Sequence, residues 1–362
     1  MIRPMNATSV AALRRRDRLT REAEEQRLSP IATRSVASRG RDRDEAPDEF
    51  RTAFERDRDR IIHAKAFRRL KHKTQVFLHP DGDHFITRLT HTLQVAQIAR
   101  ALAGALSLNE PLAEAIALGH DVGHTPFGHT GEEALSPYFP PAGWHHAAQS
   151  VRVFEVLEDL NLTWEVRDGI RAHSWRIEPP PATPEGACVR YADRFAYLTH
   201  DALDALRAGV LEADDFPGAA LERFGPPGRT WIGEMIDAVV AHSLRAGVVE
   251  MDAPTLAVMH DLRASMFERV YQSPEQRRQQ RKAIRVLQDL MDHHVANPGA
   301  IPASYRQIAA PITRQAADYV SGMTDRFALA AHRHLTGASR GGHPAGPVAG
   351  ASGGSHRSQR SR

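Results

Sequence analysis

One short segment carries most of the side chains in this sequence that could do chemistry. His120, Asp121, His124 and His129 lie within ten residues of one another, directly after an apolar stretch, and Glu132 follows. A proline and two glycines between them stop any regular helix. Loops with so many ionisable groups are usually functional. The segment is therefore the first candidate for an active site.

Two distant residues could join His120 and Asp121 around a metal ion. His91 is followed at spacings of 4, 7 and 11 by apolar residues, so it faces inward on a helix. Asp193 is a carboxylate within another apolar helical stretch, where burial is costly unless the group is paired or metal-bound. A lone inward histidine is more often a satisfied core group than a ligand. Together, however, two imidazoles and two carboxylates suit Mg, Mn, Fe or Zn. Such an ion could activate water and polarise a phosphoryl group, which indicates hydrolysis.

The elements that must position these groups are predicted to be helices. Apolar residues recur with helical spacing over residues 85–106, 111–118, 148–160, 163–170, 187–208, 231–244, 254–270 and 274–295. No sustained alternation of apolar and polar residues indicates a sheet. We therefore predict an all-α fold with a helical core and a helical C-terminal extension.

Composition and the positions of Pro and Gly predict that the chain has four parts. These are a polar N-terminal arm (1–50), a catalytic core (51–208), a helical region packed on that core (209–336) and a disordered tail (337–362). The tail is rich in Gly, Ser and Arg and has almost no apolar residues to bury. It could bind nucleic acid weakly, although a plain solvated extension is the commoner outcome for such a composition.

The overall composition fits a soluble protein without an internal disulfide framework. The chain is 41% hydrophobic and 25% charged, with a single cysteine, Cys188. No apolar run reaches the roughly 20 residues of a membrane span, and the N-terminus has no signal-peptide pattern. We expect a cytoplasmic location and no membrane partner.

The pI of 9.2 reflects the two ends of the chain. Residues 1–50 hold eleven Arg against nine acids, and residues 337–362 hold four Arg and no acid. Because the net charge of the whole chain is only +3, the part between is slightly acidic. Basicity alone therefore does not indicate a nucleic-acid footprint.

The order of the four metal-ligand candidates on helices resembles the HD superfamily of metal-dependent phosphohydrolases. Longer segments resemble the dGTPase family of deoxynucleoside triphosphate (dNTP) triphosphohydrolases within it. These segments are residues 50–77, 87–91, 120–133, 160–165, 192–201 and 322–327. The resemblance spans roughly residues 25–336. It implies an HD-domain core that cleaves between the sugar 5′ oxygen and the α-phosphorus and releases a deoxynucleoside and inorganic triphosphate.

The resemblance also implies roles for single residues. His91, His120, Asp121 and Asp193 would bind a divalent ion, Mg or Mn before Fe or Zn. His129 and Glu132 would manage protons, His124 would contact phosphate, and His146 would be a further active-site histidine. The sequence departs from the family pattern at Ala147, where many members carry Asn, so the role of His146 is open. Glu132 could instead only favour the start of a helix.

A pocket for the nucleotide is predicted beside Asp193. Tyr197 and Asp201 follow it at spacings of four and eight and so lie along the same edge of a helix. By the resemblance, Tyr197 would stack on the deoxyribose and Asp201 would accept a hydrogen bond from its 3′ hydroxyl. Without the resemblance, Tyr197 could equally be an ordinary core residue.

The predicted substrate contacts also include four polar side chains outside that helix edge. Arg88 and Arg194 adjoin metal-ligand candidates and could hold phosphates, because guanidinium groups bind them in a bidentate manner. Arg68 belongs to a basic run that could clamp the triphosphate, although most charge runs are solvated faces. Gln75 could read the sugar or base.

Three functions remain open from the sequence. The first is hydrolysis of dGTP and other dNTPs to deoxynucleoside and triphosphate. The second is an HD phosphohydrolase for nucleoside monophosphates or cyclic nucleotides. The third is a weakly catalytic binder of nucleotides or single-stranded nucleic acid. A homo-oligomer is expected by the resemblance, with no sequence feature that places its interface.

Overall fold

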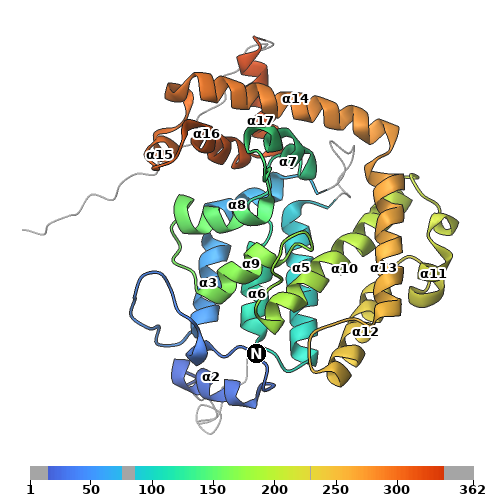
Figure 1. The fold of residues 1–362 in the computed structure, drawn as a ribbon. Coiled ribbons are helices and arrows are strands. Elements are labelled where there is room, and N and C mark those ends of the chain that lie inside the picture. The colour runs from blue at the N-terminus through green and yellow to red at the C-terminus, as the bar shows by residue number, and fades with distance from the viewer. Residues whose placement is uncertain (1–14, 76–85, 229, 338–362) are drawn as a thin grey trace, which may run out of the picture.

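The computed structural model describes residues 15–75, 86–228 and 230–337, which form helices joined by loops (Figure 1). Within these ranges the only β pairing is an isolated antiparallel bridge between Thr74 and Thr87. The all-α prediction is confirmed. The predicted tail lies, apart from its first residue, outside the described residues.

The helices up to residue 207 carry the candidate ligands or directly precede them. They are α2 (Arg18–Glu24), α3 (Ala53–His63), α4 (Lys65–Arg69), α5 (Arg88–Ala105), α6 (Glu110–Gly119), α7 (His129–Leu135), α8 (His146–Arg152), α9 (Trp164–Ala172) and α10 (Pro184–Arg207). The C-terminal helices are α11 (Gly218–Phe224), α12 (Thr230–Ala246), α13 (Ala253–Met266), α14 (Pro274–Ala296), α15 (Ala303–Arg306), α16 (Ile312–Ser321) and α17 (Asp325–Leu335). A π-helical turn, η7 (Phe267–Tyr271), continues α13.

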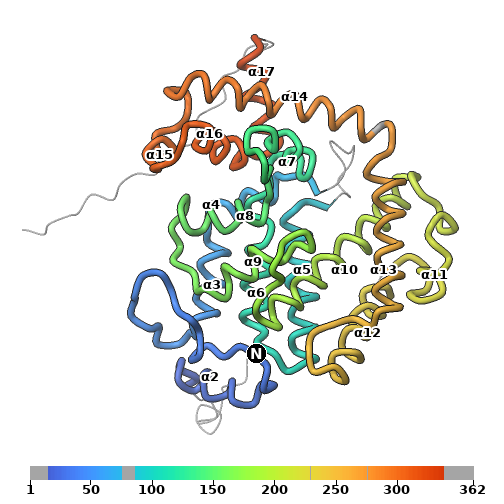
Figure 2. Tube along the Cα trace, in the orientation of Figure 1, coloured from blue at the N-terminus to red at the C-terminus, as the bar shows by residue number. Residues whose placement is uncertain are grey.

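Helices α5, α6 and α10 pack against one another at the centre of the molecule, with α3 and α9 around them (Figures 1 and 2). Their facing surfaces are rich in alanine and carry a few large apolar residues, such as Ile98 and Ile116, that are almost fully buried. Small side chains let helix axes approach closely. At Gly119, the last residue of α6, an added Cβ would lie 2.5 Å from the Ile170 side chain of α9. A larger residue before His120 would therefore displace the Ile170 side chain of α9.

Side-chain caps define where the three central helices begin. Thr87 caps α5, Asn109 caps α6, and Thr183 caps α10, which also has a proline in its first turn. Each cap satisfies a backbone N–H that the helix itself leaves without a partner, and is typically worth about 1 kcal/mol. The caps thus fix the axial position of the side chains further along each helix.

Two apolar clusters divide the described residues. The first unites α3, α5, α6, α9 and α10 with α11, α12 and α13. The second joins Phe127, Ala134, Leu135 and Trp144 to apolar residues of α14, α16 and α17, which lie together at the top of Figure 1. Apolar packing therefore places α11–α13 with the central helices and α14–α17 over the segment around α7. The sequence-based division at residue 208 stays a prediction.

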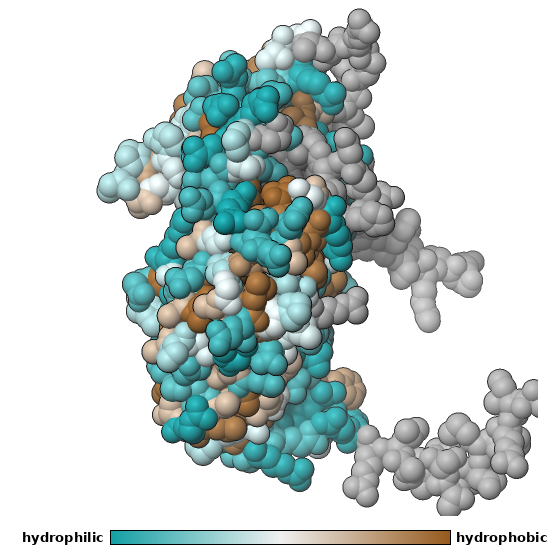
Figure 3. Space-filling view, turned by 90° about the vertical axis from the view of Figure 1, so that its right-hand side faces the viewer, coloured by the Kyte–Doolittle hydropathy of each residue, from teal (hydrophilic) through white to brown (hydrophobic). Residues whose placement is uncertain are grey.

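The outer face of α11–α13 is mixed in polarity. These helices lie on the right of Figure 1, and Figure 3 shows apolar patches among hydrophilic residues on that side. Large apolar side chains with high exposure here include Leu244 at 70% and Val248 at 49%. No helix in the described ranges is long and apolar enough to cross a membrane. The predicted homo-oligomer stays a prediction.

Candidate metal centre and its surroundings

The four predicted metal ligands come from the three central helices and meet at one point. His91 is on α5, His120 and Asp121 directly follow α6, and Asp193 is on α10. The His91 Nε2 atom lies 3.1 Å from Asp193 Oδ1. His120 Nε2 lies 3.4 Å from Asp121 Oδ1 and 3.7 Å from Asp193 Oδ1. The fold thus brings together His91 and Asp193, which are 102 residues apart in the chain.

The donor atoms of this group fit a cation. His120 Nδ1 lies 2.6 Å from the Ala117 carbonyl oxygen, so Nδ1 carries the hydrogen and Nε2 presents a lone pair. Nε2 is buried and has no hydrogen-bond partner, although two carboxylates lie close by. A lone pair facing carboxylate oxygens is favourable only with positive charge between them. Two imidazoles and two carboxylates suit a divalent ion of the Mg, Mn, Fe or Zn group.

Asp121 stays ionised despite being only 3% exposed. Burial alone would raise the pKa of this carboxyl, but the neighbouring His120, His124 and Arg88 hold it well below its usual range. Arg88 donates from Nη1 to Asp121 Oδ2 over 2.7 Å. Burial likewise opposes the lowered pKa of Asp193, whose hydrogen bond with His91 and nearby imidazoles favour the charged form. Both carboxylates are therefore available as ligands.

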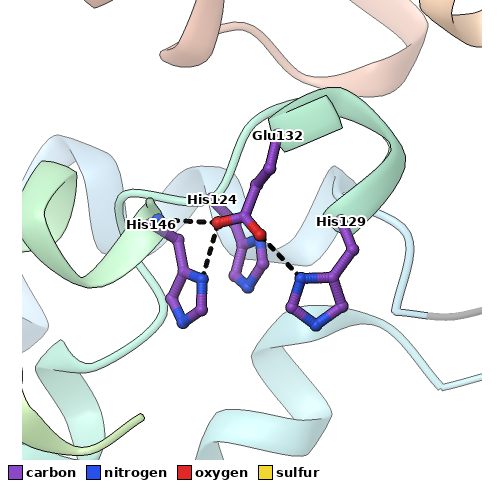
Figure 4. A group of neighbouring side chains, drawn as sticks. All are labelled: His124, His129, Glu132 and His146. Carbon is purple, nitrogen blue, oxygen red and sulfur yellow. Dashed lines mark hydrogen bonds and ion pairs between the residues drawn. The ribbon is translucent and has the colours of Figure 1, made fainter. Parts of the chain in front are cut away.

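A second group of side chains lies beside the first (Figure 4). Glu132 on α7 is at its centre. One carboxylate oxygen lies 2.7 Å from His129 Nδ1, and the other accepts from His146 Nδ1 at 2.7 Å and from the His146 backbone N–H at 2.6 Å. The His124 ring stacks on that of His146, with centroids 3.9 Å apart. The structure therefore brings the predicted catalytic residues together.

The contacts in this second group have the lengths of hydrogen bonds and are shorter than the spacing of ligand atoms around a metal ion. Ligand atoms around a tetrahedral cation would be about 3.3 Å apart, given metal–nitrogen distances of about 2.0 Å. The nitrogen–oxygen contacts of Glu132 are 2.7 Å, which is the length of a charge-assisted hydrogen bond. Burial alone would raise the pKa of Glu132, but His146 and His129 hold it well below its usual value. Glu132 is thus a carboxylate flanked by two imidazole donors.

His173 extends this group and was missed by the sequence analysis. Its Nδ1 lies 2.7 Å from the Ile170 carbonyl oxygen, and its Nε2 lies 3.0 Å from His146 Nε2. Burial lowers the pKa of His173 to about 3, so the ring is neutral. The Nε2 atoms of His146 and His173 therefore face each other within hydrogen-bond distance. The available signal was the spacing of Val166, Ile170 and His173, which share one face of a helix.

Comparison with protein families identifies two regions of the chain. Residues 88–198 match the HD domain and residues 249–334 match the phosphohydrolase-associated domain. Three similar proteins each bear the name deoxyguanosinetriphosphate triphosphohydrolase-like protein. That of Caldanaerobacter subterraneus subsp. tengcongensis is 47% identical over 88% of this chain and 94% of its own. Those of Desulfatibacillum aliphaticivorans and Cereibacter sphaeroides strain ATCC 17029 are 46% and 38% identical, over 87% and 86% of this chain and 97% and 100% of theirs.

The chain belongs to this family of deoxyguanosinetriphosphate triphosphohydrolase-like proteins. The HD-domain match contains every residue of the two groups described above. HD domains bind divalent metals, and the group of His91, His120 and Asp193 could hold one. The recognition made from the sequence is confirmed, as is the HD-type helical core.

Two arginines of the HD domain have buried guanidinium groups: Arg88, which pairs with Asp121, and Arg194, which directly follows Asp193 in the chain. Arg88 is 2% exposed, and its Nε has no partner. Arg194, next to Asp193, is 6% exposed; its Nε and Nη1 are buried without partners, and its guanidinium lies over the Trp175 ring at 4.2 Å. Buried donors without partners are costly. Both side chains are therefore prepared for an anionic ligand.

Gly128 explains how Arg88 can lie so close to the segment after α6. The backbone of Gly128 has φ +59, and an added Cβ would be 2.5 Å from Arg88 Nη2. The preceding Phe127 also has a positive φ of +63, although it is not a glycine. A left-handed conformation at a bulky residue is strained and persists only where its surroundings hold it.

The associated domain contributes two contacts that the sequence analysis missed. Arg263 on α13 donates from Nε to the Tyr197 hydroxyl at 3.1 Å, and the Tyr271 hydroxyl of η7 donates to Asp201. Burial raises the pKa of Asp201 to about 7. The spacing of eight between Arg263 and Tyr271 indicates that they share one face of a helix. It does not indicate that this face packs against α10. Tyr197 and Asp201 are thus held from α13 and η7, and we call this pair of side chains the wall.

The remaining predicted residues are placed less tightly. Arg68 is exposed on α4 and makes no ion pair with the described residues. Gln75 has a buried Oε1 without a partner, and its carbonyl oxygen accepts from Arg88 at 3.4 Å. At Ala147, the position where the sequence departs from the pattern that the resemblance implies, the backbone N–H donates to His145 Nδ1 at 3.1 Å. His145 therefore caps α8, while the ring of His146 is held by Glu132 and His173.

Proposed function

We propose that this protein hydrolyses dNTPs, dGTP among them, to a deoxynucleoside and inorganic triphosphate in a reaction that depends on a divalent metal. One observation carries the proposal: buried arginine donors without partners adjoin a group of nitrogen and oxygen atoms that fits a cation. That combination suits a polyanion bound next to a metal. The names borne by the similar proteins support the substrate class.

The metal would be held by His91, His120, Asp121 and Asp193. A divalent ion there supplies positive charge that polarises the phosphoryl group and favours ionisation of water. Mg or Mn is our first choice, because carboxylate ligands suit them, with Fe or Zn as alternatives for the imidazoles.

The remaining residues bind the substrate and move a proton. Arg88 and Arg194 would bind phosphate oxygens with donors that are otherwise unsatisfied. Cleavage breaks the bond between the α-phosphorus and the 5′ oxygen, the oxygen of water becomes bonded to phosphorus, and the departing oxygen takes up a proton. We assign that proton to His129, whose side chain is 75% exposed beside buried Glu132. Glu132 then balances the positive charge that His129 and His146 share.

The wall formed by Tyr197 and Asp201 would bind the sugar. A phenol ring against the 2′ carbon leaves no room for a ribose hydroxyl, which would select deoxynucleotides by steric exclusion. Asp201 would accept a hydrogen bond from the 3′ hydroxyl. The support for this placement is that α13 and η7 hold both side chains by hydrogen bonds, on the edge of α10 that also carries Asp193.

Product analysis tests the proposal. The protein is incubated with each of the four dNTPs and Mg or Mn, and products are separated by ion-exchange chromatography. We expect deoxynucleoside and tripolyphosphate, and loss of at least about 100-fold in rate for Asp121→Ala. Monophosphate plus pyrophosphate would contradict the assigned bond cleavage. Faster turnover of dAMP than of dATP would favour the monophosphate phosphohydrolase, and oligonucleotide binding without hydrolysis would favour the nucleic-acid binder.

A further inference from the structure

The junction between α16 and α17 contacts the metal-centre segment through backbone hydrogen bonds. Asp325, the first residue of α17, is 6% exposed. Its Oδ1 accepts from the Phe127 N–H at 3.0 Å, and its Oδ2 accepts from the Thr74 N–H at 2.8 Å. One carboxylate of the associated domain therefore joins two backbone segments that are far apart in the sequence, one at Thr74 and one at Phe127.

Both backbone segments are close in the chain to residues of the site. Phe127 lies in the turn that runs from His124 to His129 and has the strained φ of +63. Thr74 pairs with Thr87, the cap of α5, which is followed at once by Arg88. A strained turn is kept in place only by contacts that outweigh its own preference. The Asp325 carboxylate is such a contact at the strained residue itself.

Neighbouring contacts make this docking specific. Lys73, only 2% exposed, donates from Nζ to the His124 carbonyl oxygen and, over 3.0 Å, to the Ser321 carbonyl oxygen. Asp318, fully buried on α16, accepts hydrogen bonds from Nε and Nη2 of Arg152, the shortest of them 2.6 Å. Arg152 ends α8, the helix that begins with His146. The α16–α17 region thus contacts the turn, α8, and residues 73 and 74, the second of which pairs with the cap of α5.

We infer that Asp325 is a positioning residue: it holds the turn carrying His124 and His129 in the conformation that the reaction needs. Through this contact the associated domain sets the geometry of the proton-transfer group. Within the described residues, no hydrogen bond or ion pair joins Asp325 to the metal-ligand candidates or to the wall of Tyr197 and Asp201. Its effect should fall on the chemical step, because misplacing catalytic groups by about 1 Å can cost on the order of 100-fold in rate.

The variant Asp325→Asn keeps the shape of the side chain but replaces one acceptor oxygen with an NH₂ group that faces a backbone N–H. The matched control is Asp289→Asn, which removes a carboxylate that accepts from His332 inside the associated domain. We expect kcat for dATP to fall about 10- to 100-fold in Asp325→Asn with less than a threefold change in KM, and neither to move in the control. The content of bound Mn should equal that of the wild type in both variants.

Hydrogen exchange provides a readout that does not need the substrate. In Asp325→Asn, amides in the turn from residue 122 to 128 should exchange at least about tenfold faster, while those in the middle of α5 should be unchanged. The kinetic arm rests on the proposed function, and the exchange arm does not. Unchanged exchange in the turn would overturn the inference whatever the enzyme hydrolyses. Loss of Mn and faster exchange across all helices would also overturn it, because Asp325 would then only stabilise the fold.

Discussion

At the scale of single residues, hydrogen-bond lengths separate two groups that look alike in the sequence. Histidines and carboxylates make up both. His120 Nε2 has no hydrogen-bond partner, and the Asp121 carboxylate oxygen lies 3.4 Å from it. In the second group, by contrast, the imidazole nitrogen of His129 lies only 2.7 Å from the Glu132 carboxylate. The first pattern fits a cation, and the second fits shared protons. The two groups should therefore respond differently to mutation.

Glu132→Gln should separate chemistry from metal binding. Glutamine is uncharged and has only one acceptor oxygen. His129 and His146 therefore lose the negative charge that Glu132 places beside them. We expect kcat to fall by about 100- to 10,000-fold, the usual range for a general acid–base group, with the bound Mn unchanged. Glu133→Gln, an exposed neighbour on the same helix, is the control and should keep wild-type kcat. Loss of Mn in Glu132→Gln would show instead that Glu132 belongs to the metal site.

At the scale of elements, the sequence predicted the helices better than their partners. Apolar spacing predicted α5, α6 and α10 and the inward direction of His91, because periodicity reports burial. It could not show that α13 contributes Arg263 and Tyr271 to the wall of Tyr197 and Asp201. Contacts between distant helices depend on how faces match, and one sequence does not record that. His173 was missed for the same reason: its partner His146 lies on a different helix.

The turn between α6 and α7 offers a test at this scale. Gly128→Ala should destabilise the fold by about 1–3 kcal/mol, because alanine rarely adopts a φ of +59 with a ψ of −130. Its Cβ would also displace Arg88, so the KM for dNTPs should rise. Gly233→Ala on α12 meets nothing within 4 Å and should stabilise by about 0.5–1 kcal/mol. Thermal unfolding with dATP kinetics measures both. Wild-type stability and KM in Gly128→Ala would show that the close approach to Arg88 is not required.

At the scale of the whole molecule, the central helices depend on one another through the metal-ligand candidates. His91, the His120–Asp121 pair and Asp193 come from α5, α6 and α10, which form the middle of the first apolar cluster. Keeping buried Asp121 and half-buried Asp193 ionised without a cation is costly, since each needs compensating charge. A bound ion would relieve that cost and link the three helices. Metal binding should therefore change the stability of the entire fold as well as the activity.

Removal of the metal should lower the unfolding temperature. An ion present at 100 times its dissociation constant stabilises the folded state by about 2.7 kcal/mol, if it does not bind the unfolded chain. For a chain of this size each kcal/mol corresponds to about 2–4 °C or less, so EDTA should lower the midpoint by several degrees. Adding Mn should restore it. In Asp193→Asn, which loses a ligand from α10, the difference between EDTA and Mn should shrink to near zero. An equal response to Mn in that variant would mean that the stabilising ion binds elsewhere, and that the three central helices do not share it.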